Sequence, residues 1–245
     1  MEKMVVTYNV DSTKWISTAG NIGSGKSTLS ERIGNELKSL TNGKIVPFHL
    51  LQEEWKTNPY FNRYYDAINQ FYEELGNGSF TNGSGKLPNP IFFNAQYWWL
   101  TKKGNQNSEI PALLEKINVS QDRSIYEDGL FARNFMRLGL ISEENAKIYM
   151  PAYEGLSFYP LPDMVFYLKT SPEVCKERII KRGRVAERKM PLKYLEDLNE
   201  LYEEWWASFK HPNKVMINTD RLNLVDSQND IMYVLGLIRD SLANG

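Results

Sequence analysis

The chain has 245 residues, in which 29 Lys and Arg nearly balance 30 Asp and Glu, for a formal net charge of −1. This balance gives no support for a protein held on nucleic acid or on a membrane surface by bulk electrostatics. We therefore expect neither partner, and assign any anionic ligand to a local charge cluster. The length is within the range of one α/β domain, and we expect residues 1–245 to form one.

The N-terminal residues contain no apolar run long enough for a signal sequence, and no run in the chain reaches transmembrane length. Cys175 is the single cysteine, which rules out an intrachain disulfide and fits a reducing compartment. We therefore expect a cytoplasmic protein.

Short apolar runs predict buried strands at residues 15–19, 44–51, 117–120, 164–168 and 214–218. Between them lie stretches with helical spacing, among them residues 29–40, 192–206 and 227–242. Strands that alternate with helices predict an α/β fold in which a parallel sheet, here five-stranded, carries helices on both faces.

A glycine-rich loop follows the first predicted strand and leads directly into a helical stretch. It has the spacing Gly20, four residues, Gly25-Lys26-Ser27-Thr28, which is the phosphate-binding pattern G-x-x-x-x-G-K-[ST]. Glycines let backbone N–H groups approach phosphates, Lys26 offsets charge on the β and γ oxygens, and the Ser27 hydroxyl can bind Mg²⁺. We expect a nucleoside triphosphate on the loop residues Gly20, Asn21, Ile22, Gly23, Ser24, Gly25, Lys26, Ser27 and Thr28.

A second Gly-Ser-Gly-Lys stands at residues 83–86, within a Gly-, Asn- and Pro-rich stretch at 76–90. Phe80 occupies the position where the pattern needs its first glycine, and Pro88 prevents the helix that should complete an anion site. We therefore interpret residues 76–90 as a loop insertion and not as a second nucleotide site.

Paired carboxylates, Glu53 and Glu54, follow the second predicted strand at the edge of the sheet where ligands of open α/β sheets bind. A carboxylate there can accept the proton of an attacking hydroxyl during phosphoryl transfer. Taken alone, the pair is better explained as two solvated charges at a strand end.

The third predicted strand runs into Asp122 and Arg123. An acid at the end of a core strand is well placed to hold Mg²⁺, directly or through water, and the arginine can bind a carboxylate or phosphate bidentately. As an isolated tripeptide, Asp-Arg-Ser is a weak signal.

Basic residues crowd the end of a predicted helix at residues 176–188. They can simply complement the helix dipole. Alternatively, residues 181–190 form a short basic lid that covers the γ-phosphate and excludes water during transfer.

Together these stretches resemble the deoxynucleoside kinase family of the deoxycytidine, deoxyguanosine and deoxyadenosine kinase type. The resemblance rests on GNIGSGKST, NPYFNRYYD, QYWWLTKK, DRSIYED, YLKTSPEVCKERI, RGRVAER and PLKYLEDLNELYEEWW, in order from about Gly20 to Asp220. It implies a three-layer P-loop kinase fold and transfer of the ATP γ-phosphate to the 5′-hydroxyl of a deoxynucleoside with Mg²⁺. It also implies a homodimer or higher homo-oligomer.

The resemblance assigns a role to each matching residue. Glu53 matches the general base, although Glu54 stands where the family has proline, and Arg123 matches the arginine that steers the 5′-oxygen. Lys26 is expected at the transferred phosphate, with Ser27 and Asp122 on Mg²⁺. The remaining matches are Tyr65 and Glu187 for the sugar 3′-hydroxyl, Gln96 for the base edge, Arg182, Arg184 and Arg188 in the lid, and Asn223, Leu224 and Val225 over the adenine of ATP.

Base preference is predicted from Lys103 and Asp128, because family members that prefer deoxyadenosine, deoxyguanosine or deoxycytidine carry a basic residue and Asp at these positions. Asp accepts from an exocyclic amino group, whereas thymine offers a carbonyl and leaves the carboxylate unpaired. Lys103 replaces the usual arginine and lacks its planar fork. We expect purine deoxynucleosides, deoxyadenosine first.

Two other functions stay open. A nucleoside monophosphate kinase shares the phosphate loop and the basic lid. A regulatory module that binds nucleotide without turnover shares only the loop, and leaves Glu53, Arg123 and Glu187 without a common purpose.

Overall fold

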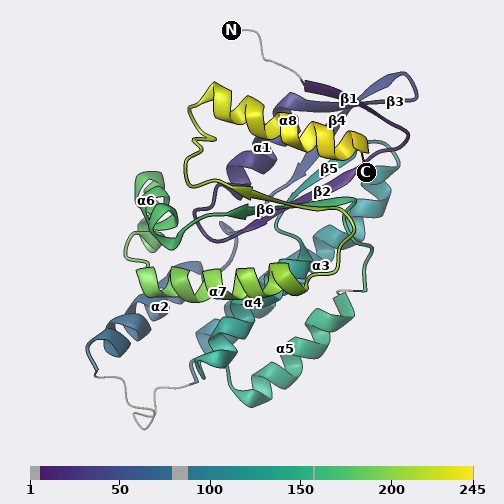
Figure 1. Cartoon of the computed structure of the whole chain (residues 1–245). Helices are drawn as coiled ribbons and strands as arrows, with labels where there is room; N and C mark the ends of the chain where they lie inside the picture. The colour runs from purple at the N-terminus through teal and green to yellow at the C-terminus, as the bar shows by residue number, and fades with distance from the viewer. Residues whose placement is uncertain (1–5, 79–87, 157, 245) are drawn as a thin grey trace.

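The computed structural model describes residues 6–78, 88–156 and 158–244. A seven-stranded sheet lies at its centre, in the order β1-β3-β4-β5-β2-β6-β7 (Figure 1). The strands are β1 (Val6–Val10), β2 (Trp15–Gly20), β3 (Leu37–Thr41), β4 (Lys44–Leu51), β5 (Asn118–Asp122), β6 (Met164–Lys169) and β7 (Lys214–Asn218).

The parallel core of the sheet agrees with the prediction. The five expected strands are β4, β5, β2, β6 and β7, and each pairs in parallel with its neighbour. The prediction of five strands was nevertheless incomplete, because β1 and β3 extend the sheet beyond β4. The pairing of β3 with β4 is antiparallel, so the whole sheet is mixed.

The additional strand β3 corrects the helix expected at residues 29–40, which ends at Glu36. Leu37, Ser39 and Thr41 are buried in alternation, as a strand at a sheet requires. The turn that follows consists of Asn42 and Gly43, with φ values of 49° and 74°. Two residues with positive φ form the tight turn that suits an antiparallel hairpin, so this dipeptide decides the local structure.

Helices cover both faces of the sheet. They are α1 (Lys26–Glu36), α2 (Phe61–Gly76), α3 (Pro90–Leu114), α4 (Ile125–Arg137), α5 (Glu143–Leu156), α6 (Pro172–Arg182), α7 (Leu192–Ser208) and α8 (Gln228–Asn244), with a short 3₁₀ helix at Val185–Glu187. The expected helices at 192–206 and 227–242 are thus confirmed as α7 and α8. The second Gly-Ser-Gly-Lys and most of the expected 76–90 insertion lie outside the described residues.

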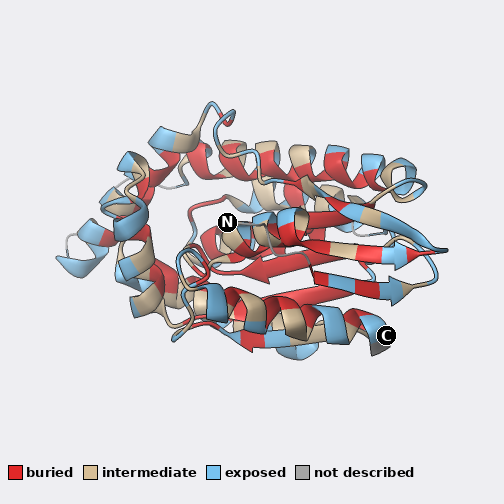
Figure 2. Ribbon diagram, turned by 90° about the horizontal axis from the view of Figure 1, so that it is seen from above, coloured by how far each residue is buried: buried red, intermediate tan, exposed pale blue. Residues whose placement is uncertain are grey.

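The two larger apolar cores separate three layers, as predicted. On one face, Ile16 and Leu168 of the sheet pack with residues of α1 and α8, including Leu29 and Val234. On the other face, Tyr167 joins a larger core built from α2, α3, α4 and α7. Strands β2, β5 and β6 are buried along almost their whole length, and Figure 2 shows such buried strands between the helices beside strands that are partly exposed. Burying apolar side chains from both faces is the main stabilising contribution to such a fold.

The topology places four strand ends at one edge of the sheet. The carboxyl ends of the parallel strands β2, β4, β5 and β6 lie there, followed by the glycine-rich loop, Glu53, Asp122 and Thr170. Ligands of open α/β sheets bind at this edge. No helix in the described part of the chain is long and apolar enough to cross a membrane.

Candidate active site

The glycine-rich loop joins β2 to α1, as predicted, and depends on glycine for its geometry. Gly23 has a φ of 85°, and a Cβ atom there would lie 2.5 Å from the Cys175 carbonyl oxygen. Only glycine fits without displacing α6. The helix α1 begins at Lys26, so the N–H groups of its first turn face the loop and complete an anion site.

Lys26 is buried in the loop, with its Nζ 3.4 Å from the carbonyl oxygen of Asn21. Burial lowers the pKa of Lys26 to about 8, with Arg123 adding to this effect and Asp122 opposing it. A phosphate would restore the charged form. The Asn21 amide donates to Leu195 O and Asn199 Oδ1, at 2.9 and 3.1 Å. This side chain therefore anchors the loop to α7, and only the Asn21 backbone is left for phosphate.

A large cavity lies over the loop, between α6 and the segment before α8. The expected adenine-loop residues Asn223, Leu224 and Val225 line it. The other lining residues are Gly23, Gly25, Lys26, Ser27, Thr28, Val174, Glu177, Arg178, Lys181, Arg182, Asp220, Arg221 and Leu222. The cavity thus brings together the predicted phosphate and adenine contacts, from residues about two hundred positions apart in the chain.

Arg178 was not assigned a role from the sequence. Its guanidinium donates to the carbonyl oxygens of Ser24, Thr219 and Leu222, at 3.2, 2.5 and 2.9 Å. It therefore clamps the glycine-rich loop to the segment that follows β7. Its place one turn before Arg182 in the basic cluster was the available signal, but nothing in the sequence separated it from its neighbours.

A second, much more confined cavity adjoins the first. Both are lined by Lys26, Ser27 and Arg182. The second is also lined by Ile22, Glu53, Trp55, Phe61, Tyr64, Tyr65, Gln96, Trp99, Arg123, Asp128, Phe131, Arg184 and Glu187. The shared residues mark where a group could pass from one ligand to the other.

Glu53 and Arg123 form an ion pair on the wall of this second cavity, with Glu53 Oε1 3.3 Å from Arg123 Nε. Burial by itself would raise the pKa of Glu53, but Arg123 and then Lys26 hold it below its ordinary value. Glu53 is therefore ionised and can accept a proton. Glu54 instead pairs with Lys102 at 3.2 Å and is 42% exposed, outside both cavities.

Arg123 also contacts a second acid, Glu127, which the sequence analysis did not single out. Arg123 Nη1 lies 3.2 Å from Glu127 Oε2, and Nη1 also donates to the Tyr202 hydroxyl. Burial raises the pKa of Glu127, against the opposing effect of Arg123. Glu127 lies in the first turn of α4 and Arg123 lies just before that helix, so their spacing of four residues was the available signal for this pair.

The residues expected on Mg²⁺ have suitable oxygen atoms. Asp122 is 2% exposed, and its Oδ1 has no hydrogen-bond partner among the described residues. Ser27 is exposed at the junction of the two cavities. The described residues contain no group of three or more His, Cys, Asp or Glu that could hold a metal. Mg²⁺ often takes one or two carboxylates plus phosphate oxygens, so a single carboxylate and a hydroxyl fit it.

Gln96 and Asp128 lie on the cavity wall, as expected of residues that read a base. Gln96 Nε2 donates to the Tyr64 hydroxyl at 2.9 Å, while Asp128 Oδ2 has no hydrogen-bond partner in the described part of the chain. Burial raises the pKa of Asp128 to about 7, against the opposing charge of Lys103.

Lys103 lies behind this wall and is not among the residues that line the cavity. Its Nζ donates to the Asp122 carbonyl oxygen at 2.7 Å and to Gln106 Oε1 at 3.2 Å. The geometry therefore does not support the expected direct contact of Lys103 with a base. The lysine side chain is shorter than the usual arginine and lacks its planar guanidinium, and it donates to protein groups instead.

The segment expected to form the lid contributes Glu187 and two arginines to the same cavity, which Tyr65 also lines. Glu187 is 1% exposed and pairs with Arg182 at 2.5 Å and with Arg184 at 3.3 Å. The Arg184 guanidinium also lies 3.8 Å from the centre of the Trp55 ring. The lid is thus attached to the residues that follow Glu53.

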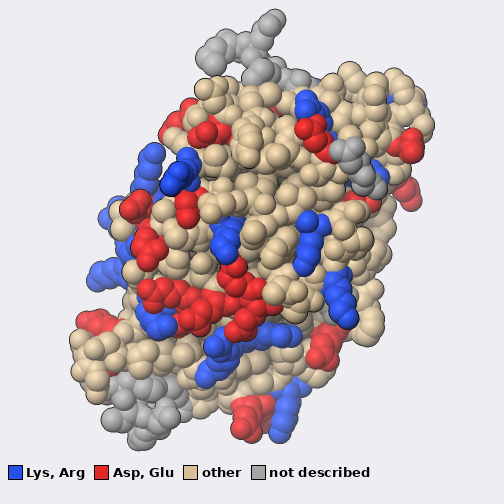
Figure 3. All heavy atoms as spheres, in the orientation of Figure 1, with Lys and Arg blue, Asp and Glu red and all other residues tan. Residues whose placement is uncertain are grey.

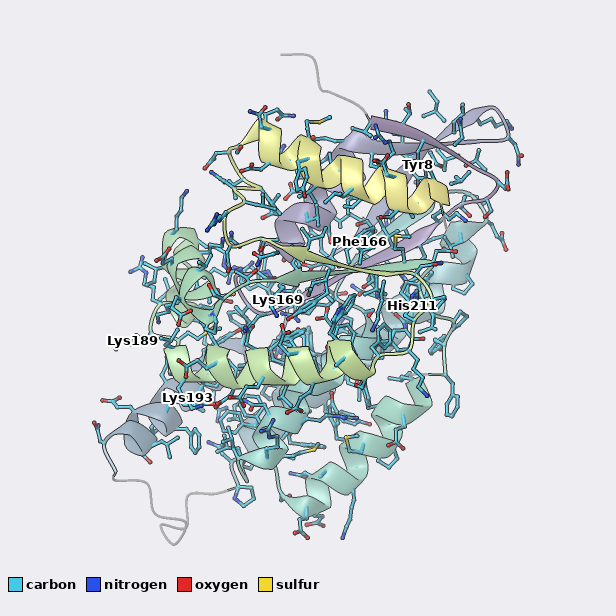
Figure 4. All side chains as sticks on the ribbon, in the orientation of Figure 1. Tyr8, Phe166, Lys169, Lys189, Lys193 and His211 are labelled. Carbon is cyan, nitrogen blue, oxygen red and sulfur yellow. The ribbon has the colours of Figure 1, made fainter. Side chains whose placement is uncertain are left out.

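Arg188, expected in the lid with these arginines, is exposed and lines neither cavity. The 3₁₀ turn at Val185–Glu187 directs Glu187 inward and the next residues outward, and Lys189 points away from the protein (Figure 4). Figure 3 shows basic side chains with acidic ones among them over α6, and mainly acidic side chains over α7. The local basic cluster expected for an anionic ligand is the set of Lys and Arg residues that line the first cavity.

Comparison with known proteins places these features in a family. The family described as deoxynucleoside kinase matches residues 16–242. A deoxyguanosine kinase of Dictyostelium discoideum is 30% identical over 217 residues, which cover 87% of this chain and 66% of that protein, just under two thirds of it. A deoxyadenosine/deoxycytidine kinase of Bacillus subtilis is 26% identical over 94% of both chains.

A solved structure has the same fold. The deoxyadenosine kinase from M. mycoides, solved with bound dATP, superposes with a TM-score of 0.68 at 24% identity, covering 92% of this chain and 98% of that one. At this identity the likeness shows the fold alone. It agrees with the three-layer arrangement around the parallel strands.

Proposed function

The chain belongs to the deoxynucleoside kinase family, and on that premise we propose that it transfers the γ-phosphate of ATP to the 5′-hydroxyl of a purine deoxynucleoside. Deoxyadenosine is the first choice, followed by deoxyguanosine and deoxycytidine. The observation that carries the proposal is the meeting of two cavities at Lys26, Ser27 and Arg182, with the Glu53–Arg123 pair on one side of the junction.

Glu53 acts as general base in this proposal. Its ionised carboxylate takes the proton of the 5′-hydroxyl as the oxygen attacks the γ-phosphate in line. Arg123 keeps Glu53 ionised and orients it. Lys26 and the lid residues Arg182 and Arg184 offset the charge on the transferred group. Ser27 and Asp122 would hold Mg²⁺, which would supply further neutralisation of phosphate charge when it is bound.

Asp128 and Gln96 select the base. Asp128 Oδ2 lacks a partner within the described protein, so an exocyclic amino group on the substrate can donate to it. Thymine would present a carbonyl and leave a buried acceptor unpaired, at a cost of about 1–3 kcal/mol. Lys103 acts on the base only through its charge on Asp128. Tyr65 and Glu187 are proposed to hold the sugar 3′-hydroxyl.

The donor is proposed to lie with its adenine against Asn223, Leu224 and Val225. Residues 1–245 are proposed to act as one domain, with a lid at about 181–190. Because Arg188 faces away, only Arg182 and Arg184 are expected to contact phosphate. A homodimer or higher homo-oligomer, as the resemblance implies, and a cytoplasmic location stay predictions.

The test is steady-state turnover of ATP with each of the four deoxynucleosides and with deoxyadenosine monophosphate. We expect deoxyadenosine to give the highest kcat/KM and thymidine the lowest. Turnover of the monophosphate alone would identify a nucleoside monophosphate kinase, and nucleotide binding without turnover would identify a regulatory module.

Asp128→Ala tests how the base is selected. Removing the unpaired acceptor should shift the deoxyadenosine to thymidine ratio of kcat/KM towards thymidine by about tenfold or more. An unchanged ratio in this variant would remove Asp128 from base selection.

A further inference from the structure

Glu127 is fully buried on α4 and lies between the two halves of the site. It lines neither cavity, so it touches neither proposed ligand. We propose that Glu127 is a positioning residue that couples the donor phosphate loop to the acceptor-side Arg123. This inference rests on the proposed function, because it concerns how the two substrates of that reaction are aligned.

One oxygen atom of Glu127 joins three separate elements. Glu127 Oε2 accepts from the backbone N–H of Gly20 at 3.1 Å, from the Tyr202 hydroxyl at 2.6 Å and from Arg123 Nη1 at 3.2 Å. Gly20 is the first glycine of the phosphate loop and Tyr202 lies on α7. Buried hydrogen bonds to a charged acceptor are strong and directional. The carboxylate therefore fixes the loop and the arginine relative to each other.

The other contacts of Arg123 show why its position matters. Its Nε lies 3.3 Å from Glu53 Oε1, and its guanidinium lies 4.7 Å from the centre of the Phe131 ring. Arg123 also has a φ of 63°, a conformation that costs energy in residues other than glycine and persists only when surrounding contacts enforce it. Glu127 supplies such a contact from the side opposite the proposed base.

The charges support the same conclusion. Arg123 forms ion pairs with two acids, Glu53 and Glu127. Without the charge of Glu127, Arg123 would pair with Glu53 alone, and a tighter pair is a poorer proton acceptor. Any shift of Gly20 when the donor binds is also transmitted to Arg123 through the shared oxygen. Coupling of this kind is a difference in binding free energy and acts in both directions.

The experiment measures binding of a non-hydrolysable ATP analogue with and without deoxyadenosine, and kcat under saturating substrates, in wild type and variants. In wild type, deoxyadenosine should change the affinity for the analogue by about fivefold or more. In Glu127→Gln this dependence should disappear and kcat should fall about ten- to a hundredfold. Tyr202→Phe, which removes one of the three donors, should change both quantities in the same direction by less.

Glu203→Gln is the matched control. Glu203 is next to Tyr202 on α7. Like Glu127, it accepts hydrogen bonds from a tyrosine and from a basic residue, here Tyr167 at 2.9 Å and Lys169 at 2.7 Å. Figure 4 shows Lys169 between β6 and α7. This variant should keep the wild-type dependence and kcat, so a general effect of losing a carboxylate would show itself here.

The outcomes separate the inference from the function. The inference would be overturned if Glu127→Gln kept the wild-type kcat and the wild-type effect of deoxyadenosine on affinity for the ATP analogue. It would also be overturned if deoxyadenosine had no effect on that affinity in the wild type. Either result would leave the kinase assignment intact. If Glu127→Gln fails to fold in a thermal unfolding measurement, Tyr202→Phe decides by the same two quantities. Absence of turnover by wild type with any deoxynucleoside would instead refute the proposed function.

Discussion

The proposed donor cavity and the proposed acceptor cavity adjoin each other but are built from different parts of the chain. The donor side is largely main chain, formed by the glycine-rich loop, the first turn of α1 and the segment that Arg178 clamps by three carbonyl oxygens. The acceptor side is largely side chain. Four charged residues, Glu53, Arg123, Asp128 and Glu187, converge there from three segments of the chain.

This difference indicates how each side achieves its selectivity. Backbone N–H groups recognise phosphate, which every nucleoside triphosphate carries. Binding on the donor side therefore depends more on the conformation of the loop than on particular side chains. The acceptor must be recognised by its hydroxyls and base edge, which requires side chains with matching donors and acceptors. Substitutions on the acceptor side should therefore alter turnover and substrate choice, and those on the donor side should alter nucleotide affinity.

The largest effect is expected on the acceptor side, from Glu53→Gln. Loss of the base should lower kcat on the order of a thousandfold, because the neutral amide cannot take the hydroxyl proton. Affinity for an ATP analogue, measured by calorimetry, should stay within about twofold of wild type.

Glu54→Gln is the control for that variant. Glu54 is half-exposed and paired with Lys102, so its loss should change kcat by less than about twofold. An equal loss of turnover in Glu54→Gln would reassign the base to Glu54.

On the donor side, Gly23→Ala should weaken binding of the ATP analogue by roughly ten- to a hundredfold. Its Cβ would meet a backbone oxygen at 2.5 Å in a residue whose φ is 85°. Gly43→Ala provides the matched control, since Gly43 has a φ of 74° and open space around it. It should cost about 1 kcal/mol of unfolding free energy and leave nucleotide affinity unchanged; weakened binding there would point to a global effect.

The pH dependence should also separate the two sides. Burial raises the pKa of Asp128 to about 7, and only the ionised form accepts from an amino group. Below pH 7 the carboxyl takes up a proton, so KM for deoxyadenosine should rise, by about tenfold at pH 6, and it should be constant well above pH 7.

Asp128→Asn should abolish that dependence, because the amide does not titrate. KM for ATP is the internal reference, as the donor cavity does not contain Asp128. A rise in KM for deoxyadenosine that persists in Asp128→Asn would assign the titration to another group.

The smallest effect is expected from Trp55→Leu, which removes the ring beneath Arg184. A cation–π contact contributes about 0.5–2 kcal/mol, and we expect kcat/KM for deoxyadenosine to fall roughly threefold because the lid loses this attachment. Trp98→Leu removes a similar contact, with Lys102 at 5.3 Å from the ring centre, outside the cavity. If both variants lose the same activity, the lid attachment is not the cause.

Much of the fold was predictable because its signals are local. The five parallel strands are apolar runs, and the phosphate loop is a spaced pattern between a strand and a helix. The strand β3 was missed because Leu37–Thr41 continues a helical stretch without a break in composition. Pairing with β4 through the Asn42-Gly43 turn overrides that preference, as tertiary context often does.

Parts of the site were not predictable because they too depend on tertiary contacts. The sequence placed Lys103 at the base and Arg188 in the lid, and the structure turns both away from the acceptor cavity. It did not single out Glu127, Tyr202 or Arg178. Their partners lie on other elements, and a spacing along the chain carries no information about a contact across the core.

The sequence by itself determined the layers of the fold, the position of the phosphate loop and the residues that end the parallel strands, because hydrophobic periodicity and glycine spacing act over a few neighbours. Only the tertiary structure decided which acids pair with Arg123, which arginines face the junction of the cavities and which buried carboxylate oxygens have no hydrogen-bond partner in the described protein. These pairings depend on packing between distant segments. Burial removes water from the charged groups there, so that neighbouring side chains must pair with them instead.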